Sequence, residues 1–442
     1  MGSNPTPDTG ICGCSLARFK APPCHGGDRG FKSHHPRPSM IKNKDQQIEH
    51  LLNWGVEQVI DKNHLKNALK SEKKLRIKYG VDPTSPDIHL GHLACLKKLE
   101  EFQKLGHQVI FLIGDYTTKI GDPSGVSRTR PMLTDSEIQK NVKTYLDQVK
   151  FAIDTSKTEI RKNSEWLGKL TYGDIVNLAS KFTVARILER DDFQKRYENK
   201  TPIGLHELFY PVMQAYDSVM LEADVEIGGQ DQTFNFLSGR HLQEAIGQKP
   251  QDILTLPLLI GLDGKDKMSK SLNNYIGITE SPDIQFGKVM SLKDNLIIDY
   301  FKLCTEVNQE KIKDYEKQLK TQETNPKDLK EELAWQIVAL CHSKKNADQA
   351  KAEFRRVFKD KDRPTKSPYF KPSKPKLTAL ELLNEAKILK SSSEAQRLID
   401  QKAVKLMHGS KEKTLTDWKE VVELKNGDIL KIGKKTFLEI RF

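Results

Sequence analysis

Long apolar runs and clustered cysteines are both missing from this chain of 442 residues. No stretch approaches the roughly 18 consecutive apolar residues that a membrane-spanning helix requires. The six cysteines stand at positions 12, 14, 24, 95, 304 and 341, which is too few and too scattered for a disulfide framework. No CxxC pair is present to indicate a zinc site. We therefore expect a soluble globular protein of a reducing compartment, without membrane segments and without a bound metal.

Acidic residues are in the minority, since 72 Lys and Arg stand against 60 Asp and Glu and give a formal net charge of +12. A basic balance indicates a polyanionic partner such as a nucleic acid, although a lysine-rich composition alone produces the same bias. A chain of this length has room for two or three domains.

Residues 1–39 have no periodic apolar pattern and are rich in Gly, Pro, Ser and His. We expect them to be a disordered leader, for which a transit peptide, an expression leader and a misread start codon remain alternatives. A transit peptide would make the protein organellar, and either of the others leaves it cytoplasmic. An ordinary amphipathic pattern begins at Met40.

A strand, a helix and a second strand are predicted in succession over residues 74–113. "KLRIKYGV" (74–81) has strand character, "LGHLACLKKLEEFQKLG" (90–106) has helical spacing, and "QVIFLIGD" (108–115) is a continuous apolar run. This order predicts a doubly wound parallel α/β sheet, whose ligands bind at the carboxyl ends of the strands. We expect residues 133–200 to be mostly helical, and "LTLPLLIGLDG" (254–264) to return to a buried strand that ends in a turn.

Two short motifs indicate a nucleotide site. In "HLGH", His89 and His92 lie at the start of the predicted helix, where backbone N–H groups are unpaired. Such a pair can hold phosphate oxygens, and Gly91 leaves room for a flat base against the backbone. In "KMSKS", Lys267 and Lys270 stand on a loop that can close over a pyrophosphate. Either motif alone could be a helix cap or a solvated loop, but both in this order indicate one site.

A third motif concerns specificity. Tyr210, Gln214 and Asp217 recur at i, i+4 and i+7 in "FYPVMQAYDSVM", which places them on one face of a helix. The apolar neighbours indicate a packed helix, so this polar face is expected to line a pocket.

With these motifs the chain resembles the class I aminoacyl-tRNA synthetases, and among them the bacterial-type tyrosyl-tRNA synthetases, from about Met40 to the C-terminus. The resemblance implies a tyrosine–tRNA ligase, which activates L-tyrosine with ATP to tyrosyl-adenylate and pyrophosphate. It then transfers tyrosine to the 3'-terminal adenosine of tRNA(Tyr). The resemblance also implies Mg²⁺ as the companion of ATP and a homodimer. "KFTVARILERDDFQKRY" (181–197) is a candidate part of the dimer interface, with an intrachain core as the alternative.

The resemblance implies an order of domains in which the leader (1–39) precedes a Rossmann-like catalytic domain. The predicted parts after the leader are the catalytic domain (40–265) with an insert near 126–205, the KMSKS loop with an α-helical domain (266–358), a basic linker (359–375) and a small α+β RNA-binding domain (376–442).

The resemblance assigns roles to individual residues. The catalytic groups would be Thr84, His89, His92, Arg130, Lys267 and Lys270. ATP would contact Gly91, Gly228, Gly229, Asp231, Met268, Ser269 and Ser271. Tyrosine would be held by Asp82, Asp122, Tyr210, Gln214, Asp217 and Gln232. A basic face made of Lys390, Ser392, Arg397 and Lys402 would bind the tRNA backbone.

One position departs from the best-known branch of the family. That branch has a tyrosine, which bonds the substrate phenol, where this chain has Lys78; a second branch with KMSKS has lysine there. We expect the phenol to lose one partner, so that Asp217 contributes more of the discrimination. Val126 also replaces a lysine, which leaves Arg128 and Arg130 as the cationic groups of that segment.

Two other functions compete with the ligase. One is the related tryptophanyl enzyme, which lacks the glutamine at position 214. The other is an RNA-binding paralogue that keeps the fold without activity. The intact motifs argue against loss of activity, and Gln214 argues against tryptophan.

Overall fold

The computed structural model of the chain describes residues 43–122, 133–358, 369–389, 391–409, 411–433 and 436–442. The predicted leader, Val126, Arg128, Arg130 and Lys390 lie outside the described residues.

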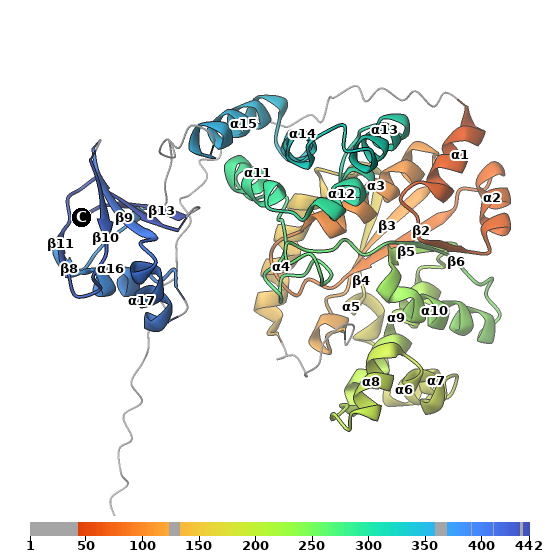
Figure 1. Cartoon of the computed structure of the whole chain (residues 1–442). Helices are drawn as coiled ribbons and strands as arrows, with labels where there is room; N and C mark the ends of the chain where they lie inside the picture. Colours follow the sequence, from red (N-terminus) through yellow and green to blue (C-terminus); the bar gives the residue numbers. More distant parts are fainter. Residues whose placement is uncertain (1–42, 123–132, 359–368, 390, 410, 434–435) are drawn as a thin grey trace, which may run out of the picture. The chain divides into compact units, whose positions relative to one another are not determined.

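A six-stranded sheet with strand order β1-β6-β5-β2-β3-β4 forms the centre of residues 43–358 (Figure 1). All neighbouring strands are parallel except β1, which runs antiparallel to β6. The predicted doubly wound parallel α/β fold is therefore confirmed. The strands are β1 (Gln58–Ile60), β2 (Arg76–Val81), β3 (Gln108–Ile113), β4 (Thr158–Lys162), β5 (Val225–Gly229) and β6 (Asp252–Leu256).

The apolar run of β3 is continuous because helices cover both faces of the sheet. Val109, Phe111 and Ile113 belong to the core that includes α3 (Leu90–Lys104) and α12 (Ile297–Cys304). The alternating Ile110 and Leu112 pack with α5 (Ser164–Leu167) and α9 (Tyr210–Met220) on the other side. Figure 1 shows α3 and α12 on one side of the strands and α5 and α9 on the opposite side.

The structure differs from the sequence prediction at two strands. β4 is a parallel strand of the main sheet, although it falls in a stretch expected to be mostly helical. β6 ends at Leu256, so the buried strand predicted within residues 254–264 includes only their first three positions before the chain leaves the sheet. Pro257 follows directly, and proline has no N–H to continue a ladder.

Helices account for most of the remaining chain up to residue 358. Before β6 these are α1 (Lys44–Asn53), α2 (Lys62–Lys70), α4 (Asp135–Val149), α6 (Tyr172–Ala179), α7 (Val184–Leu188), α8 (Asp191–Glu198) and α10 (Thr233–Ala245). After β6 they are α11 (Pro282–Met290), α13 (Gln309–Lys320), α14 (Pro326–Cys341) and α15 (Lys344–Phe358), besides α12. No helix among the described residues has the length and apolar character needed to cross a membrane.

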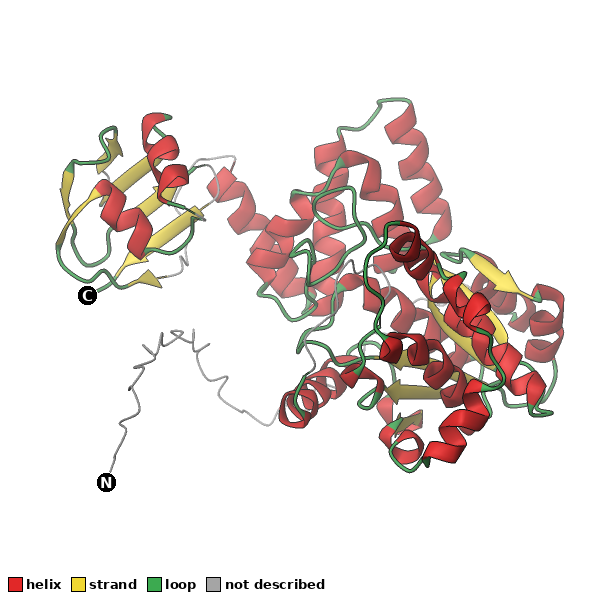
Figure 2. Cartoon of the chain, turned by 90° about the horizontal axis from the view of Figure 1, so that it is seen from below, coloured by secondary structure: helices red, strands yellow, loops and turns green. Residues whose placement is uncertain are grey.

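Residues 369–442 have their own sheets and their own core (Figure 2). A five-stranded sheet has the order β10-β9-β12-β13-β7, and β8 pairs with β11. The helices are α16 (Ala379–Glu385) and α17 (Ser392–Asp400). The strands are β7 (Tyr369–Phe370), β8 (Lys376–Thr378), β9 (Val404–His408), β10 (Lys411–Leu415), β11 (Val421–Glu423), β12 (Ile429–Ile432) and β13 (Thr436–Ile440). Because β7 pairs with β13, this sheet includes residues 369–370, which lie in the segment that we predicted to be a linker (359–375).

Candidate active site

The main cavity lies at the carboxyl ends of β2 and β5, where the strand order reverses. From β2 the chain proceeds to β3 and β4 on one side, and β5 and β6 follow on the other. In open parallel sheets this switch point is the usual ligand site. A cavity of about 300 Å³ opens here, within the size range of small-molecule pockets. Every described residue predicted to bind nucleotide or tyrosine, or to act in catalysis, lines this cavity except Lys270 and Ser271.

The two histidines lie side by side at the start of α3, with ring centroids 3.9 Å apart. His89 is the N-cap and His92 the third helical residue, so His89 stands just before the first turn rather than in it. Burial, and secondarily the nearby lysines, lower both pKa values, that of His92 to about 3. Both imidazoles are thus neutral near pH 7 and can donate hydrogen bonds to phosphate oxygens. Nδ1 of His89 is buried and has no hydrogen-bond partner among the described residues.

The KMSKS segment is tied to the start of α3 by backbone hydrogen bonds just after the motif. Leu90 N–H donates to the carbonyl of Ile276 at 3.0 Å, and Ile278 N–H donates to that of Ile88 at 3.0 Å. The side chain of Asn274 accepts the Ser269 N–H at 2.7 Å, which fixes the loop from the other side. The two predicted signatures therefore belong to one hydrogen-bonded structure.

The two lysines of the motif have different partners. Lys267 Nζ lies 2.6 Å from the carboxylate of Asp231, the predicted ribose ligand. Lys270 Nζ lies 3.3 Å from the hydroxyl of Tyr145 on α4 and 5.2 Å from the centroid of its ring. Burial lowers the pKa of Lys270 to about 8. Ser271 is exposed and its hydroxyl lies 2.8 Å from that of Ser269.

Two carboxylates that line the cavity, Asp82 and Asp122, lie close enough to influence each other. Asp82 accepts hydrogen bonds from Thr117 Oγ1 at 2.8 Å and from the Tyr210 hydroxyl at 2.9 Å. Burial raises the pKa of Asp82 to about 7, and the Asp122 carboxylate adds to this rise. Asp122 itself accepts from Gln232 Nε2 at 2.8 Å. Such a group of acceptors suits a small cationic ligand.

Gln214, which lines the same cavity, has a buried Oε1 without a hydrogen-bond partner among the described residues. Buried polar atoms are nearly always bonded, so this oxygen indicates a donor on the ligand.

The close approach of the strand ends depends on glycine at two positions. A Cβ at Gly114, after β3, would collide with the Asp82 carboxylate and the Thr117 hydroxyl. A Cβ at Gly228 would lie 2.6 Å from the Phe236 ring, which lines the cavity. Gly114 was missed in the sequence, although its place at the end of a buried strand is a signal.

Asp217 also lines the cavity and is buried, with 3 % of its surface exposed. Its carboxylate accepts from Trp166 Nε1 at 2.8 Å and from Asn163 Nδ2 at 3.2 Å. Burial raises the pKa of Asp217 to about 7. Asn163 and Trp166 were missed because they follow β4, the strand that the sequence did not reveal.

Lys78 contributes to the wall of the cavity from within a buried ion pair. Its Nζ lies 2.8 Å from Glu226 Oε1 and donates to Ser218 Oγ at 2.8 Å. The sequence marked Lys78 as a departure from the better-known branch but gave no indication of Glu226 as its partner.

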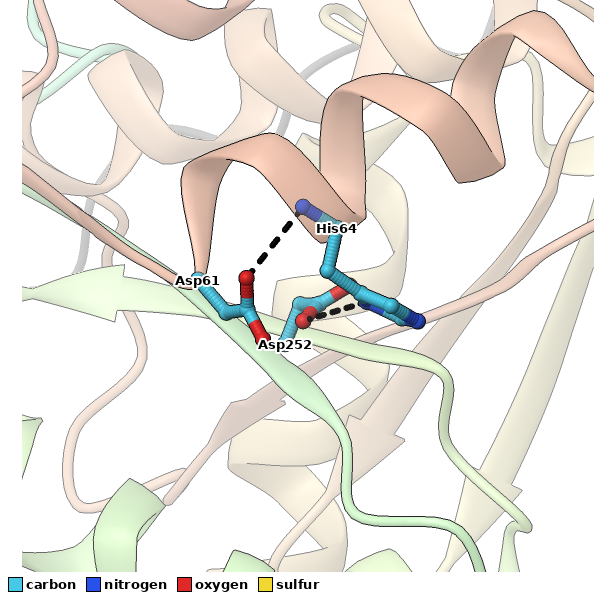
Figure 3. A group of neighbouring side chains, drawn as sticks. All are labelled: Asp61, His64 and Asp252. Atoms are coloured by element: carbon cyan, nitrogen blue, oxygen red, sulfur yellow. Dashed lines mark hydrogen bonds and ion pairs between the residues drawn. The ribbon is translucent and has the colours of Figure 1, made fainter.

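One group of potential metal ligands lies outside this cavity. Asp61, His64 and Asp252 lie side by side (Figure 3), and their ligand atoms are all within 4.8 Å of one another. His64 Nδ1 lies 2.8 Å from the buried Asp252 carboxylate, and Arg240 approaches that carboxylate to 3.8 Å. The carboxylate thus already faces an imidazole and a guanidinium. We interpret the group as an ionic connection between α2 and β6 rather than as a metal site.

The predicted RNA-binding residues lie around α17. Ser392 is its first residue, Arg397 lies in its last turn, and Lys402 follows it. All three are exposed. Ser392 Oγ donates to Asn384 Oδ1 at 3.2 Å, whereas the long basic side chains of Arg397 and Lys402 are accessible to a polyanion.

Comparison with known proteins finds the same family over most of the chain. Residues 70–359 match the family model described as tRNA synthetases class I (W and Y). The chain is 46 % identical over 404 residues to tyrosine–tRNA ligase 2 of Clostridium acetobutylicum, covering 90 % of this chain and 99 % of that protein. It is 45 % identical over 396 residues to tyrosine–tRNA ligase of Thermotoga maritima, covering 90 % and 97 % respectively.

Similarity also extends to solved structures. A tyrosyl-tRNA synthetase of Archaeoglobus fulgidus, crystallised with L-tyrosine, matches with a TM-score of 0.58 at 23 % identity, over 70 % of this chain and 100 % of that one. At this identity the match concerns the fold alone.

Proposed function

The chain belongs to the class I tRNA synthetases of the tryptophan and tyrosine group, and from this premise we propose that it ligates tyrosine to tRNA(Tyr). It would activate L-tyrosine with ATP to tyrosyl-adenylate and pyrophosphate, then transfer tyrosine to the terminal adenosine of the tRNA. The relatives that match at 45–46 % identity are named tyrosine–tRNA ligases.

The observation that supports tyrosine most strongly is the set of buried acceptors that line the cavity. The buried carboxylate of Asp217 lines it and can accept a hydrogen bond from a phenol hydroxyl. Asp82, Asp122 and the unbonded oxygen of Gln214 also line it and can hold an ammonium. Phenylalanine has no hydroxyl for Asp217, and the indole of tryptophan has a different shape and donor position.

The activation step needs no general base, because the attacking carboxylate of tyrosine is already ionised near pH 7. The protein would have to orient the reactants and stabilise charge on the transferring phosphoryl group. The neutral pair His89 and His92 would donate hydrogen bonds from the start of α3. Lys267 and Lys270 would supply positive charge from the opposite loop once ATP displaces their contacts with Asp231 and Tyr145.

ATP is the nucleotide that this family uses, and we infer Mg²⁺ as its companion. The carboxylate of Asp231 pairs with Lys267 at 2.6 Å until ATP and its companion ion arrive and displace that lysine. This arrangement favours a metal that arrives with the phosphates over one held by protein ligands.

A homodimer is also part of the proposal. Large apolar side chains of the predicted insert are exposed, namely Tyr172, Val176, Val184, Tyr197 and Leu205. Exposed apolar surface of this kind is typical of a protein interface. Within residues 181–197, however, Ile187 packs with Phe193 and Val212 inside the chain, so only part of this segment could be shared. A cytoplasmic location stays a prediction.

Attachment of labelled tyrosine to total bacterial tRNA tests the function. We expect the purified chain to charge tRNA, and the variant His92→Ala to lose about 100-fold in rate, as for one lost transition-state donor. His241→Ala is the matched control, because His241 is exposed and lies outside the cavity. A folded wild-type chain that binds tRNA without charging it would favour the RNA-binding paralogue.

A further inference from the structure

Arg190 is a buried cation next to the amino-acid site, although no sequence motif includes it. Only 4 % of its surface is exposed. It stands directly before α8, and the side chains lining the cavity do not include it. An isolated buried guanidinium would be costly, so its partners define what it does.

Two carboxylates hold the guanidinium in place. Its Nη2 donates to Asp122 at 2.6 Å, and its Nε donates to Asp192 at 2.8 Å. The ring of Phe193 lies 5.6 Å from the guanidinium carbon and adds a cation–π contact. Burial disfavours the charged form, but the carboxylates outweigh burial and hold the pKa of Arg190 above its ordinary value.

Asp122 is the member of this group that reaches the cavity. One of its oxygens accepts from Arg190 and the other accepts from Gln232. Both carboxylate oxygens are therefore oriented by the protein, and each has further lone-pair capacity for another donor. Among the described residues, the charged groups around Asp122 include Arg190, Asp192 and Asp82, with the Tyr210 hydroxyl beside them, and Arg196 acts in turn on Asp192.

We propose that Arg190 is a positioning residue for the ammonium group of the amino-acid substrate and acts through Asp122, which it holds ionised and oriented towards the cavity. The inference rests on the proposed function. Without the guanidinium, Asp122 and Asp192 would lose the cation that pairs with both of them, and Asp82 would still lie close to Asp122. Such a group of carboxyls relieves its repulsion by protonation or by rotating a side chain away, and either change weakens an ammonium site.

The test uses two analogues that each lack one end of the amino acid. Tyramine has the phenol and the ammonium but no carboxylate, and 3-(4-hydroxyphenyl)propionate has the phenol and the carboxylate but no ammonium. Inhibition constants for both are measured in tyrosine-dependent ATP–pyrophosphate exchange. In Arg190→Gln we expect the KM for tyrosine and the inhibition constant of tyramine to rise about tenfold or more, as for a weakened charged hydrogen bond. The constant for the propionate and the KM for ATP should stay within about twofold of wild type.

Arg196→Gln is the matched control. Arg196 is a second buried arginine of the same segment and forms a bidentate ion pair with Glu207, away from the cavity lining. Its loss should lower the Tm and leave the tyramine-to-propionate ratio at the wild-type value. Arg190→Lys keeps the charge and should recover part of the tyramine affinity. If Arg190→Gln does not fold, Arg190→Lys is compared with wild type for the same two analogues.

Two results would overturn the role of Arg190. Equal weakening of both analogues would mean a general distortion of the pocket, and weakening of the propionate alone would mean a contact with the carboxylate. Either result presupposes an active wild type. A wild type without tyrosine-dependent exchange would contradict the proposed function instead.

Discussion

Lys78 Nζ lies 2.8 Å from Glu226 Oε1, and the two side chains are 0 % and 1 % exposed. Ser218 donates to Glu226 at 3.1 Å and accepts from Lys78, so the pair belongs to a hydrogen-bonded network. The charge of Lys78 also lowers the pKa of the nearby Asp217, although burial has the larger, opposite effect. Lys78 is thus part of a buried network that acts on the carboxylate of Asp217.

Lys78→Met should destabilise the protein strongly, because Glu226 would remain buried without a counter-charge. The expected loss in free energy of unfolding is about 3–5 kcal/mol, measured by urea denaturation. Lys73→Met is the control. The Lys73 side chain is largely exposed and pairs with Asp224, so this substitution should lower the free energy of unfolding by less than about 1 kcal/mol. Similar losses in both variants would contradict a special role for the buried pair.

Asp217→Asn should reduce the preference for tyrosine over phenylalanine. Above about pH 7, where Asp217 is ionised, the variant exchanges a charged acceptor for a neutral one, and a hydrogen bond to a charged group contributes about 1.5–3 kcal/mol. We expect kcat/KM for tyrosine to fall about 10- to 100-fold, while that for phenylalanine stays nearly unchanged. An equal decrease for both amino acids would mean that Asp217 supports the pocket without reading the phenol.

The same variant should alter the pH dependence of stability. Burial raises the pKa of Asp217 to about 7, so between pH 4 and 7 the folded state keeps a proton that the unfolded state has released. Stability from this group is therefore lost as the pH rises through that window, by at most about 1.4 kcal/mol per pH unit. Relative to wild type, Asp217→Asn should gain stability from pH 5 to 7 and level off above that. A difference between the two proteins that is constant with pH would contradict this.

The pKa of about 8 for Lys270 predicts an alkaline limb in the activation step. The burial that lowers this pKa leaves the amine charged below pH 8 and neutral above it. kcat/KM for ATP, which reports the free enzyme, should therefore decrease above about pH 8. Lys270→Arg should remove this decrease, because a guanidinium stays protonated. An unchanged alkaline limb in the arginine variant would assign it to another group.

Arg397→Glu and Lys402→Glu should weaken tRNA binding without affecting adenylate formation. Both residues are exposed in a unit with its own core, so a change of charge there should leave the fold intact. Affinity for tRNA should fall with salt, and the slope should decrease by about one for each phosphate contact removed. Filter binding at several salt concentrations measures the slope. Unchanged affinity and slope would place the tRNA on another surface.

The parallel sheet and the two signature motifs were predictable because buried strands and helix starts have local patterns. β3 has an unbroken apolar run, and HLGH stands at a helix start that the turn before it marks. β4 was missed because it is an edge strand with the sequence "TEIRK" and no fully buried residue. Its apolar content is that of a surface segment, and with it the partners of Asp217 were missed.

Contacts between residues far apart in the chain could not be predicted from the sequence, for a different reason. Asp122 and Arg190 are 68 positions apart, and Lys78 and Glu226 are 148 apart, so no spacing rule connects them. Each looks like an ordinary surface charge until the fold buries it.

Amino-acid-dependent ATP–pyrophosphate exchange tests the central claim most directly. The purified chain is assayed with L-tyrosine, L-phenylalanine and L-tryptophan in turn. Exchange with tyrosine alone is the predicted result and would support both the reaction and the Asp217 pocket. Exchange with tryptophan, or no exchange with any of the three from folded protein, would contradict the account.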